Sequence, residues 1–142
     1  MAAHAKLSPS ASSRWMTCPG SVTLIGGMPT RPYKESIYAK AGTAMHEVAE
    51  RCLNKPKLTA ADFIGKTVYG VEITEEQAEI SQKFVDFVQA MDGVKFYEQR
   101  VAIMDDCFGT ADAIIINGSH LTIADLKTGA GVFVDAEENT QL

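Results

Sequence analysis

The sequence predicts an α/β (α+β) fold in which helices pack against a sheet. Two segments before Asp92 repeat their apolar residues at helical spacing. After Gly93 the pattern changes to extended segments rich in β-branched residues. The last two of these segments are separated by Asn117-Gly118-Ser119-His120, which is typical of a tight hairpin. The predicted order is therefore two helices followed by three antiparallel strands.

The chain has the size and composition of one folded domain. Its 142 residues are 46% hydrophobic and 22% charged, which is enough to bury a core. No apolar run approaches the roughly 20 residues that a membrane helix needs. The N-terminus lacks the apolar stretch of a signal peptide. We therefore expect a single domain over residues 1–142, with an irregular segment over 1–34, and a cytoplasmic protein without membrane contact.

The first part of the chain predicts little regular structure. Ser10 or Ser12 can cap a short helix that ends before Cys18-Pro19-Gly20. Residues 20–34 contain the glycines and prolines of a loop. The three cysteines of the chain are odd in number and widely spaced, which excludes a disulfide framework and a paired-cysteine metal site.

Two longer helices follow. The first is predicted to begin at Thr43 and to end at Asn54, shortly before Pro56. The second is predicted to begin at Thr74, a good helix cap, and to stop at Asp92-Gly93. The apolar stripe that we expect to face the core in this second helix consists of Ile80, Phe84, Phe87, Val88 and Met91.

The strands are predicted from β-branched and aromatic runs between turn residues. A short strand is expected within 67–73, a Gly-rich turn at 129–135, and the start of an unfinished helix at 136–142. The three strands of the central sheet are predicted at Phe96–Ile103, Phe108–Ile116 and Leu121–Thr128.

The hairpin brings charged residues together. If its loop is centred on Gly118-Ser119, Asp112 lies directly opposite Asp125, with Cβ atoms about 4.5–5.5 Å apart, and Lys127 shares their face. Two like charges at that separation are destabilising unless a positive charge, such as a divalent cation, lies between them. A register shifted by one residue would separate the pair and weaken this argument. The alternative interpretation is that both aspartates cap strand ends and face water.

The net charge of −5 argues against a protein that holds DNA by a broad basic surface. No basic run occurs in the chain. If DNA is the substrate, local positive charge, a bound metal ion or parts outside this chain must hold it.

The ordered motifs resemble a known superfamily. Phe108-Gly109-Thr110-Ala111-Asp112 is followed by Asp125-Leu126-Lys127-Thr128-Gly129, and both are preceded by Gly42-Thr43-Ala44-Met45-His46-Glu47. This set, together with Ser8-Pro9-Ser10 and Cys18-Pro19, resembles the PD-(D/E)XK nuclease superfamily. It is most similar to the RecB/AddB-like branch and to phage-encoded proteins of that type. The resemblance implies a restriction-endonuclease-like core, with a mixed central sheet and flanking helices, truncated after the third core strand.

The resemblance also implies site residues. Lys127 is expected to position the attacking water and stabilise charge, and Gln141 to hold the substrate or the lysine. Glu98, on the strand before Asp112, is a weaker candidate and reads more simply as an exposed strand carboxylate. The residues expected to bind Mg²⁺ or Mn²⁺ are His46, Asp112, Asp125 and, through its carbonyl, Leu126.

The function implied is metal-dependent hydrolysis of DNA phosphodiester bonds. We expect an exonuclease of phage or bacterial recombination or repair, with DNA and a recombination or replication protein as partners, acting in the bacterial cytoplasm. A catalytically silent DNA-binding or assembly module with the same fold is the first alternative, and an RNA or small-molecule phosphodiesterase is the second.

The pattern of the RecB/AddB-like branch continues with a tyrosine four residues after Gln141, whereas the sequence ends at Leu142. We therefore expect a fragment that binds metal, cleaves DNA poorly alone, and self-associates to cover an exposed core. Cys18 stands where some relatives bind an iron–sulfur cluster, but the three C-terminal cysteines of that site are absent from the sequence.

Overall fold

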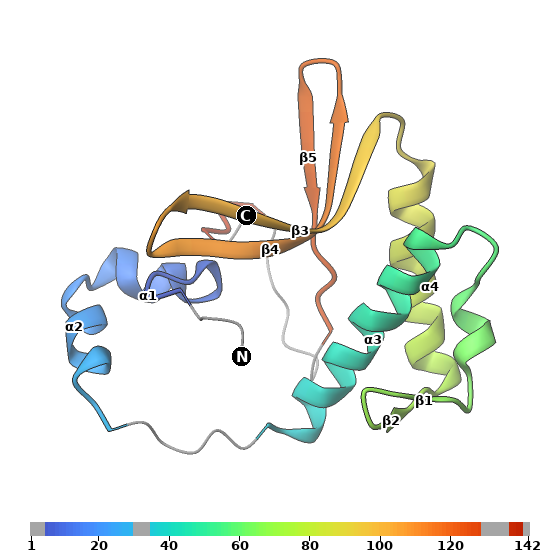
Figure 1. The fold of residues 1–142 in the computed structure, drawn as a ribbon, viewed down its shortest axis with the longest axis horizontal. Coiled ribbons are helices and arrows are strands. Elements are labelled where there is room, and N and C mark those ends of the chain that lie inside the picture. The colour runs from blue at the N-terminus through green and yellow to red at the C-terminus, as the bar shows by residue number, and fades with distance from the viewer. Residues whose placement is uncertain (1–4, 30–34, 129–136, 141–142) are drawn as a thin grey trace. The chain divides into compact units, whose positions relative to one another are not determined.

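The computed structural model describes residues 5–29, 35–128 and 137–140, and it has a mixed α+β fold (Figure 1). The chain divides into two compact units. One comprises residues 1–34, 100–110 and 133–142, and the other comprises 35–99 and 111–132. The residues expected to bind metal belong to the second unit. Among the described residues no helix is long and apolar enough to cross a membrane.

The first long helix, α3 (Ile37–Asn54), carries His46. It begins at Ser36, whose hydroxyl accepts a hydrogen bond from the Ala39 amide at 3.1 Å. The predicted end at Asn54 is confirmed, but the predicted start at Thr43 is wrong by nearly two turns. The residues that follow the Ser36 cap are of mixed polarity, so their apolar spacing does not indicate where the helix begins.

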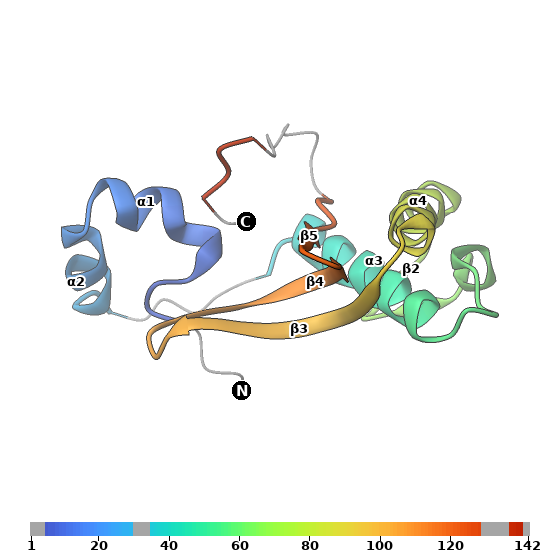
Figure 2. The ribbon, with the colours of Figure 1, turned by 90° about the horizontal axis from the view of Figure 1, so that it is seen from above.

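The second long helix, α4 (Glu75–Ala90), packs along α3 (Figure 2). Its start is confirmed: Thr74 and Gln77 cap each other's backbone amides reciprocally. Its predicted apolar stripe is wrong in part, because Ile80 and Phe87 are exposed. Small side chains allow two helices to approach closely. The buried residues of α4 are accordingly small: Ala78, Ser81, Val85 and Val88.

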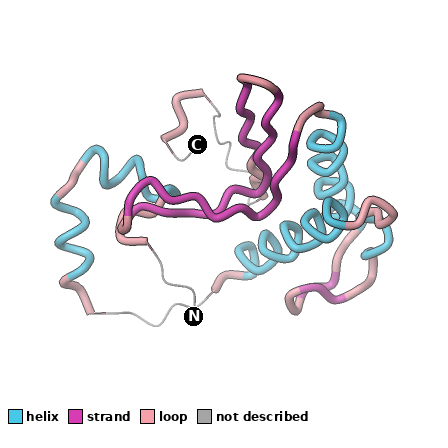
Figure 3. Tube along the Cα trace, turned by 45° about the horizontal axis from the view of Figure 1, so that its top comes forward, coloured by secondary structure: helices cyan, strands magenta, loops and turns pink. Residues whose placement is uncertain are grey.

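The central sheet has the strand order β3-β4-β5, with β3 at Val94–Met104, β4 at Cys107–Asn117 and β5 at His120–Ala124. Strands β4 and β5 pair antiparallel around a two-residue loop (Figure 3). The pairs run from Asn117 opposite His120 to Ala113 opposite Ala124, which confirms the predicted register. Strand β5 ends four residues earlier than predicted. Both sheets formed by the described residues are antiparallel, so the parallel strand of the predicted mixed sheet is not among them.

The core of this second unit lies between α3, α4 and the sheet. Ala113 and Ile115 of β4 pack with Val48 and Cys52 of α3 and with Val85 of α4. A 3₁₀ helix, η2 (Ala60–Phe63), and the small hairpin of β1 (Thr67–Val68) and β2 (Val71–Glu72) close one end of it. The short strand predicted within 67–73 is therefore a pair of strands.

The other unit contains short helices: η1 (Pro9–Ala11), α1 (Ser12–Thr17) and α2 (Gly20–Gly26). The indole of Trp15 donates a hydrogen bond to the carbonyl of Ser8 at 2.9 Å, which ties α1 to the chain before it. The helix predicted near Ser12 is confirmed. The loop predicted from residue 20 is wrong over Gly20–Gly26. Of the predicted helix start at 136–142, only residues 137–140 are described; they are not helical, and Glu138 has φ 55°. The Gly-rich turn predicted at 129–135 lies outside the described residues.

Candidate metal centre

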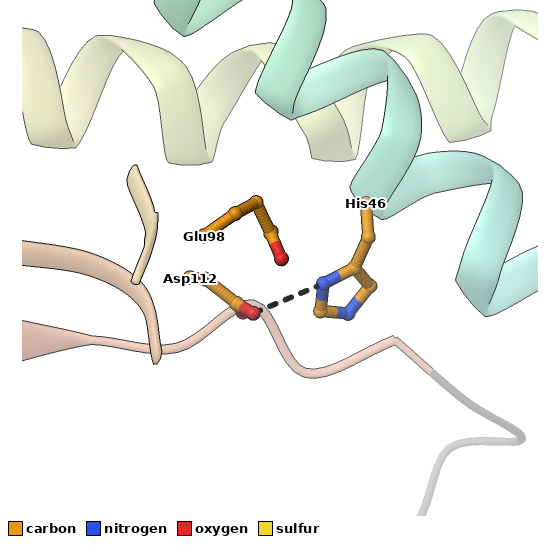
Figure 4. Close-up of side chains that lie close together, drawn as sticks. All are labelled: His46, Glu98 and Asp112. Atoms are coloured by element: carbon orange, nitrogen blue, oxygen red, sulfur yellow. Dashed lines mark ion pairs between the residues drawn. The ribbon is translucent and has the colours of Figure 1, made fainter. Parts of the chain in front are cut away.

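His46 lies on the side of α3 that faces the sheet, one position beyond the buried Met45. Its imidazole Nδ1 is 3.4 Å from Oδ1 of Asp112 (Figure 4). The histidine side chain is 33% exposed and the aspartate side chain 11% exposed, so the pair is largely shielded but open on one side. Helix α3 and strand β4 therefore each deliver one candidate ligand to the same place.

Asp112 uses its other oxygen to hold the chain beyond β5. Its Oδ2 accepts a hydrogen bond from the amide of Leu126 at 2.7 Å. The last backbone pair of the hairpin is Ala113 with Ala124, and continuing this register by one residue sets Asp112 opposite Asp125. Where the backbone pairing of β4 and β5 ends, the Asp112 side chain thus accepts a hydrogen bond from the amide of Leu126.

Asp125 and Lys127 form an ion pair in that segment. Lys127 Nζ lies 2.6 Å from Asp125 Oδ2, with the aspartate side chain 14% exposed and the lysine 43% exposed. The contact lacks the alignment of a hydrogen bond. Asp125 Oδ2 is shielded from solvent and accepts no hydrogen bond from the described part of the chain. A buried carboxylate oxygen in this state favours a further positive partner.

Glu98 of β3 joins the histidine and the aspartate. One ligand atom from each of His46, Glu98 and Asp112 lies within 4.8 Å of the others, and the three side chains converge in Figure 4. Glu98 has φ 47°, in the left-handed region. A residue other than glycine has a free energy about 1–2 kcal/mol higher there. The sequence contains no sign of this backbone conformation, so the strand pattern alone reads Glu98 as an exposed carboxylate.

The neighbouring carboxylates favour the protonated form of His46. Asp112, as a hydrogen-bond partner, raises the pKa of His46 above its ordinary value of 6.5, and the charges of Asp112, Glu98 and Asp125 add to this against an opposing effect of burial. Burial raises the pKa of Glu98, and the charge of Asp112 raises it further. The carboxylates therefore favour positive charge at this place.

The profile of the DUF2800 family, described as a protein of unknown function, matches residues 4–142. The chain belongs to the DUF2800 family. No solved structure matches it.

The donor set of this DUF2800 chain fits a divalent cation. Carboxylate oxygens suit Mg²⁺ and Mn²⁺, and an imidazole nitrogen among them favours Mn²⁺. With bonds of about 2.1 Å, ligands on opposite sides of an octahedral ion are about 4.2 Å apart. The separation of up to 4.8 Å among the three ligand atoms is close to this value. Asp125 is not one of these three residues, and its Oδ2 is paired with the Lys127 ammonium at 2.6 Å.

The residues expected from the sequence fall into two groups in this DUF2800 structure. His46 and Asp112 meet directly, while Asp125 and Lys127 pair with each other just past the end of β5. Leu126 lies between them in the chain, with its amide bonded to Asp112. Gln141 lies outside the described residues. Glu98, which the sequence left as the weaker candidate, lies with His46 and Asp112.

Proposed function

We propose that this chain is a metal-dependent deoxyribonuclease with a PD-(D/E)XK core. The observation that carries the proposal is the meeting of His46 from α3 with Asp112 from β4, beside the Asp125–Lys127 pair. Helix α3 and strand β4 bring a histidine and a carboxylate into contact, and the segment after β5 carries a second carboxylate and an ammonium group. Their order along the chain is that of the motif set of the RecB/AddB-like branch, which supports an exonuclease of recombination or repair.

His46, Asp112 and Asp125 would hold Mg²⁺ or Mn²⁺, with the carbonyl of Leu126 as a further ligand. Bound there, the ion would supply Lewis-acid activation of a phosphodiester and a water of lowered pKa. Asp112 has a second task, because its bond to the Leu126 amide fixes the segment that carries Asp125 and Lys127. The ligands from the strand and from the segment after β5 would therefore keep a constant separation.

Lys127 would act on the phosphate side of the site. Its ammonium pairs with Asp125, and the lysine side chain is 43% exposed, so a substrate phosphate could approach it from solvent. An ammonium in that position orients a water molecule by hydrogen bonding and stabilises negative charge that develops on the phosphoryl oxygens. It cannot bind the cation, so its role is separable from that of the ligands.

DNA binding requires more than this site, because the chain has a net charge of −5. The bound cation and Lys127 would contact the scissile phosphate, and a protein partner of recombination or replication would supply the remaining contacts. The acidic charge favours the alternative of a catalytically silent module that binds DNA or assembles with a partner. The two functions differ in whether Lys127 matters for DNA cleavage.

The test is incubation of labelled linear and circular DNA with the purified chain and Mn²⁺, Mg²⁺ or EDTA. We expect cleavage of linear DNA with Mn²⁺ or Mg²⁺ and none with EDTA. Lys127→Ala should abolish cleavage while Mn²⁺ binding by calorimetry stays close to that of the wild type. His46→Ala should weaken Mn²⁺ binding.

Lys83→Ala is a matched control, because Lys83 also pairs with a carboxylate, Glu79 on α4, at 2.8 Å on the surface. It should cleave like the wild type. Mn²⁺ binding without any cleavage by the wild type would favour the silent module. Cleavage by Lys127→Ala at the wild-type rate would exclude a catalytic role for the lysine and, with it, the proposed hydrolysis.

A further inference from the structure

Glu98 has a backbone conformation that its place in the chain does not require. Among the described residues, three that are not glycine have positive φ: Tyr69, Glu98 and Glu138. Tyr69 lies in the turn between β1 and β2, and Glu138 lies in a turn of residues 137–140. Turns commonly contain such residues. Glu98 instead lies within the 11-residue strand β3, where the backbone is normally extended.

The left-handed conformation changes the direction of the Glu98 side chain. Successive side chains of a regular strand point to opposite faces. Tyr97 packs against the core that α3 shares, so a regular strand would direct residue 98 away from α3. Glu98 nevertheless has a carboxylate oxygen within 4.8 Å of the ligand atoms of His46 and Asp112 (Figure 4). The irregular backbone therefore lets two consecutive residues of β3 face the same helix.

Glu98 is exposed, so a carboxylate there could point into water, yet one of its oxygens lies within 4.8 Å of a carboxylate oxygen of Asp112. Backbone strain and like-charge repulsion at one residue are typical of a functional site.

We propose that Glu98 is a further ligand of the divalent cation held by His46 and Asp112, delivered to it by the left-handed backbone of residue 98. This inference rests on the metal site of the proposed function, but not on nuclease activity. A cation between the three side chains neutralises the repulsion between Glu98 and Asp112. The strain at residue 98 is then compensated by a metal–oxygen bond that an extended strand residue would not make.

The experiment measures Mn²⁺ binding by calorimetry and the melting temperature in EDTA, on the full chain and three variants. Glu98→Gln removes the charge and keeps the size. Glu98→Asn also relieves the strain, because asparagine accepts the left-handed conformation more readily. Tyr69→Asn is the matched control, since Tyr69 has φ 48° and is exposed in the β1–β2 turn.

Glu98→Gln should lower the Mn²⁺ affinity by at least about ten-fold, the smallest effect typical of losing even an indirect partner of a metal. Its melting temperature in EDTA should be equal to or higher than that of the wild type. Glu98→Asn should melt higher still in EDTA and bind Mn²⁺ as weakly. Tyr69→Asn should melt higher with wild-type Mn²⁺ affinity.

Wild-type Mn²⁺ affinity in Glu98→Gln would overturn the proposal, and so would a marked loss of melting temperature, which would indicate a structural role. If the wild-type chain binds Mn²⁺ but cleaves no DNA, the nuclease function fails, while the binding data on Glu98→Gln still decide this proposal.

Discussion

Asp112 Oδ2 accepts a hydrogen bond from the amide of Leu126 at 2.7 Å, just beyond the last backbone pair of β4 and β5. Leu126 is buried, and this hydrogen bond is partly shielded from solvent. One carboxylate therefore joins two functions: Oδ2 holds the hairpin end together, and Oδ1 faces His46. A substitution at Asp112 must be chosen so that these functions can be separated.

The first prediction separates these two functions of Asp112 by measuring stability in EDTA, without bound metal. Asp112→Ala leaves the Leu126 amide without an acceptor, and an unpaired buried donor lowers the free energy of unfolding by about 1–3 kcal/mol. Asp112→Asn keeps an acceptor oxygen and removes the repulsion with Asp125 and Glu98, so it should unfold at least as late as the wild type. Urea denaturation of both variants measures this difference. Equal stability of the two would show that the hydrogen bond contributes little.

The second prediction concerns protons and the cation. The pKa of His46 is raised, and a histidine binds metal only in its neutral form, so Mn²⁺ binding must release a proton when the pH is below that pKa. The affinity should fall about ten-fold for each pH unit below the raised pKa, and the slope should vanish above it. Calorimetry in buffers of different ionisation enthalpy counts the protons. His46→Asn should abolish the release, and an unchanged release in that variant would assign the proton to another group.

The third prediction tests the turn before β3. Gly93 has φ 130°, and a Cβ there would lie 2.4 Å from the carbonyl oxygen of Ile116. Gly93→Ala should therefore lose about 2–5 kcal/mol of stability from strain and overpacking together. Gly118 has φ 59° with open space around it, so Gly118→Ala should lose only about 1–2 kcal/mol. Denaturant midpoints give both values, and a larger loss at Gly118 would contradict the predicted order.

The fourth prediction concerns thiol reactivity. Cys18 is exposed, whereas Cys52 and Cys107 are buried, and burial raises the pKa of the Cys52 thiol. Because the thiolate is the reactive form, a thiol reagent should modify Cys18 rapidly and the other two only on unfolding. Mass spectrometry of the native protein after brief alkylation identifies the sites. Cys18→Ser should remove the fast reaction, and rapid labelling of Cys52 would mean that α3 opens often.

The hairpin was predictable because its signals are local. Gly118 and Ser119 form the turn, and the alternation on either side fixes the register, which the structure has as predicted. The cap at Thr74 is equally local. The place of Asp112 opposite the segment of Asp125 followed from that register alone. The meeting of Asp112 with His46 did not, because it depends on how α3 packs on the sheet.

Other features depend on tertiary packing and are not visible in the sequence. The buried face of α4 was predicted from the largest apolar side chains, yet close contact with α3 selects Ala78 and Ser81 instead. Ser81 then satisfies its hydroxyl by donating to the Met45 carbonyl at 3.2 Å. The left-handed backbone of Glu98 is a further example, since glutamate has no preference for it.

Gly42 lies one helical turn before His46 on α3, and a Cβ there would be 2.9 Å from Thr128 Oγ1. The chain just past Lys127 therefore runs against the bare backbone of the helix. Helix α3 therefore carries two residues that matter for the site, four positions apart. Gly42 leaves room for Thr128, which directly follows Lys127, and His46 is a candidate ligand. A designer who transfers this centre to another scaffold must carry over the glycine and the crossing chain together with the ligands. With alanine at position 42 the Thr128 hydroxyl would have to turn away from the helix, whereas its backbone carbonyl oxygen, 3.8 Å from that Cβ, would be in ordinary contact.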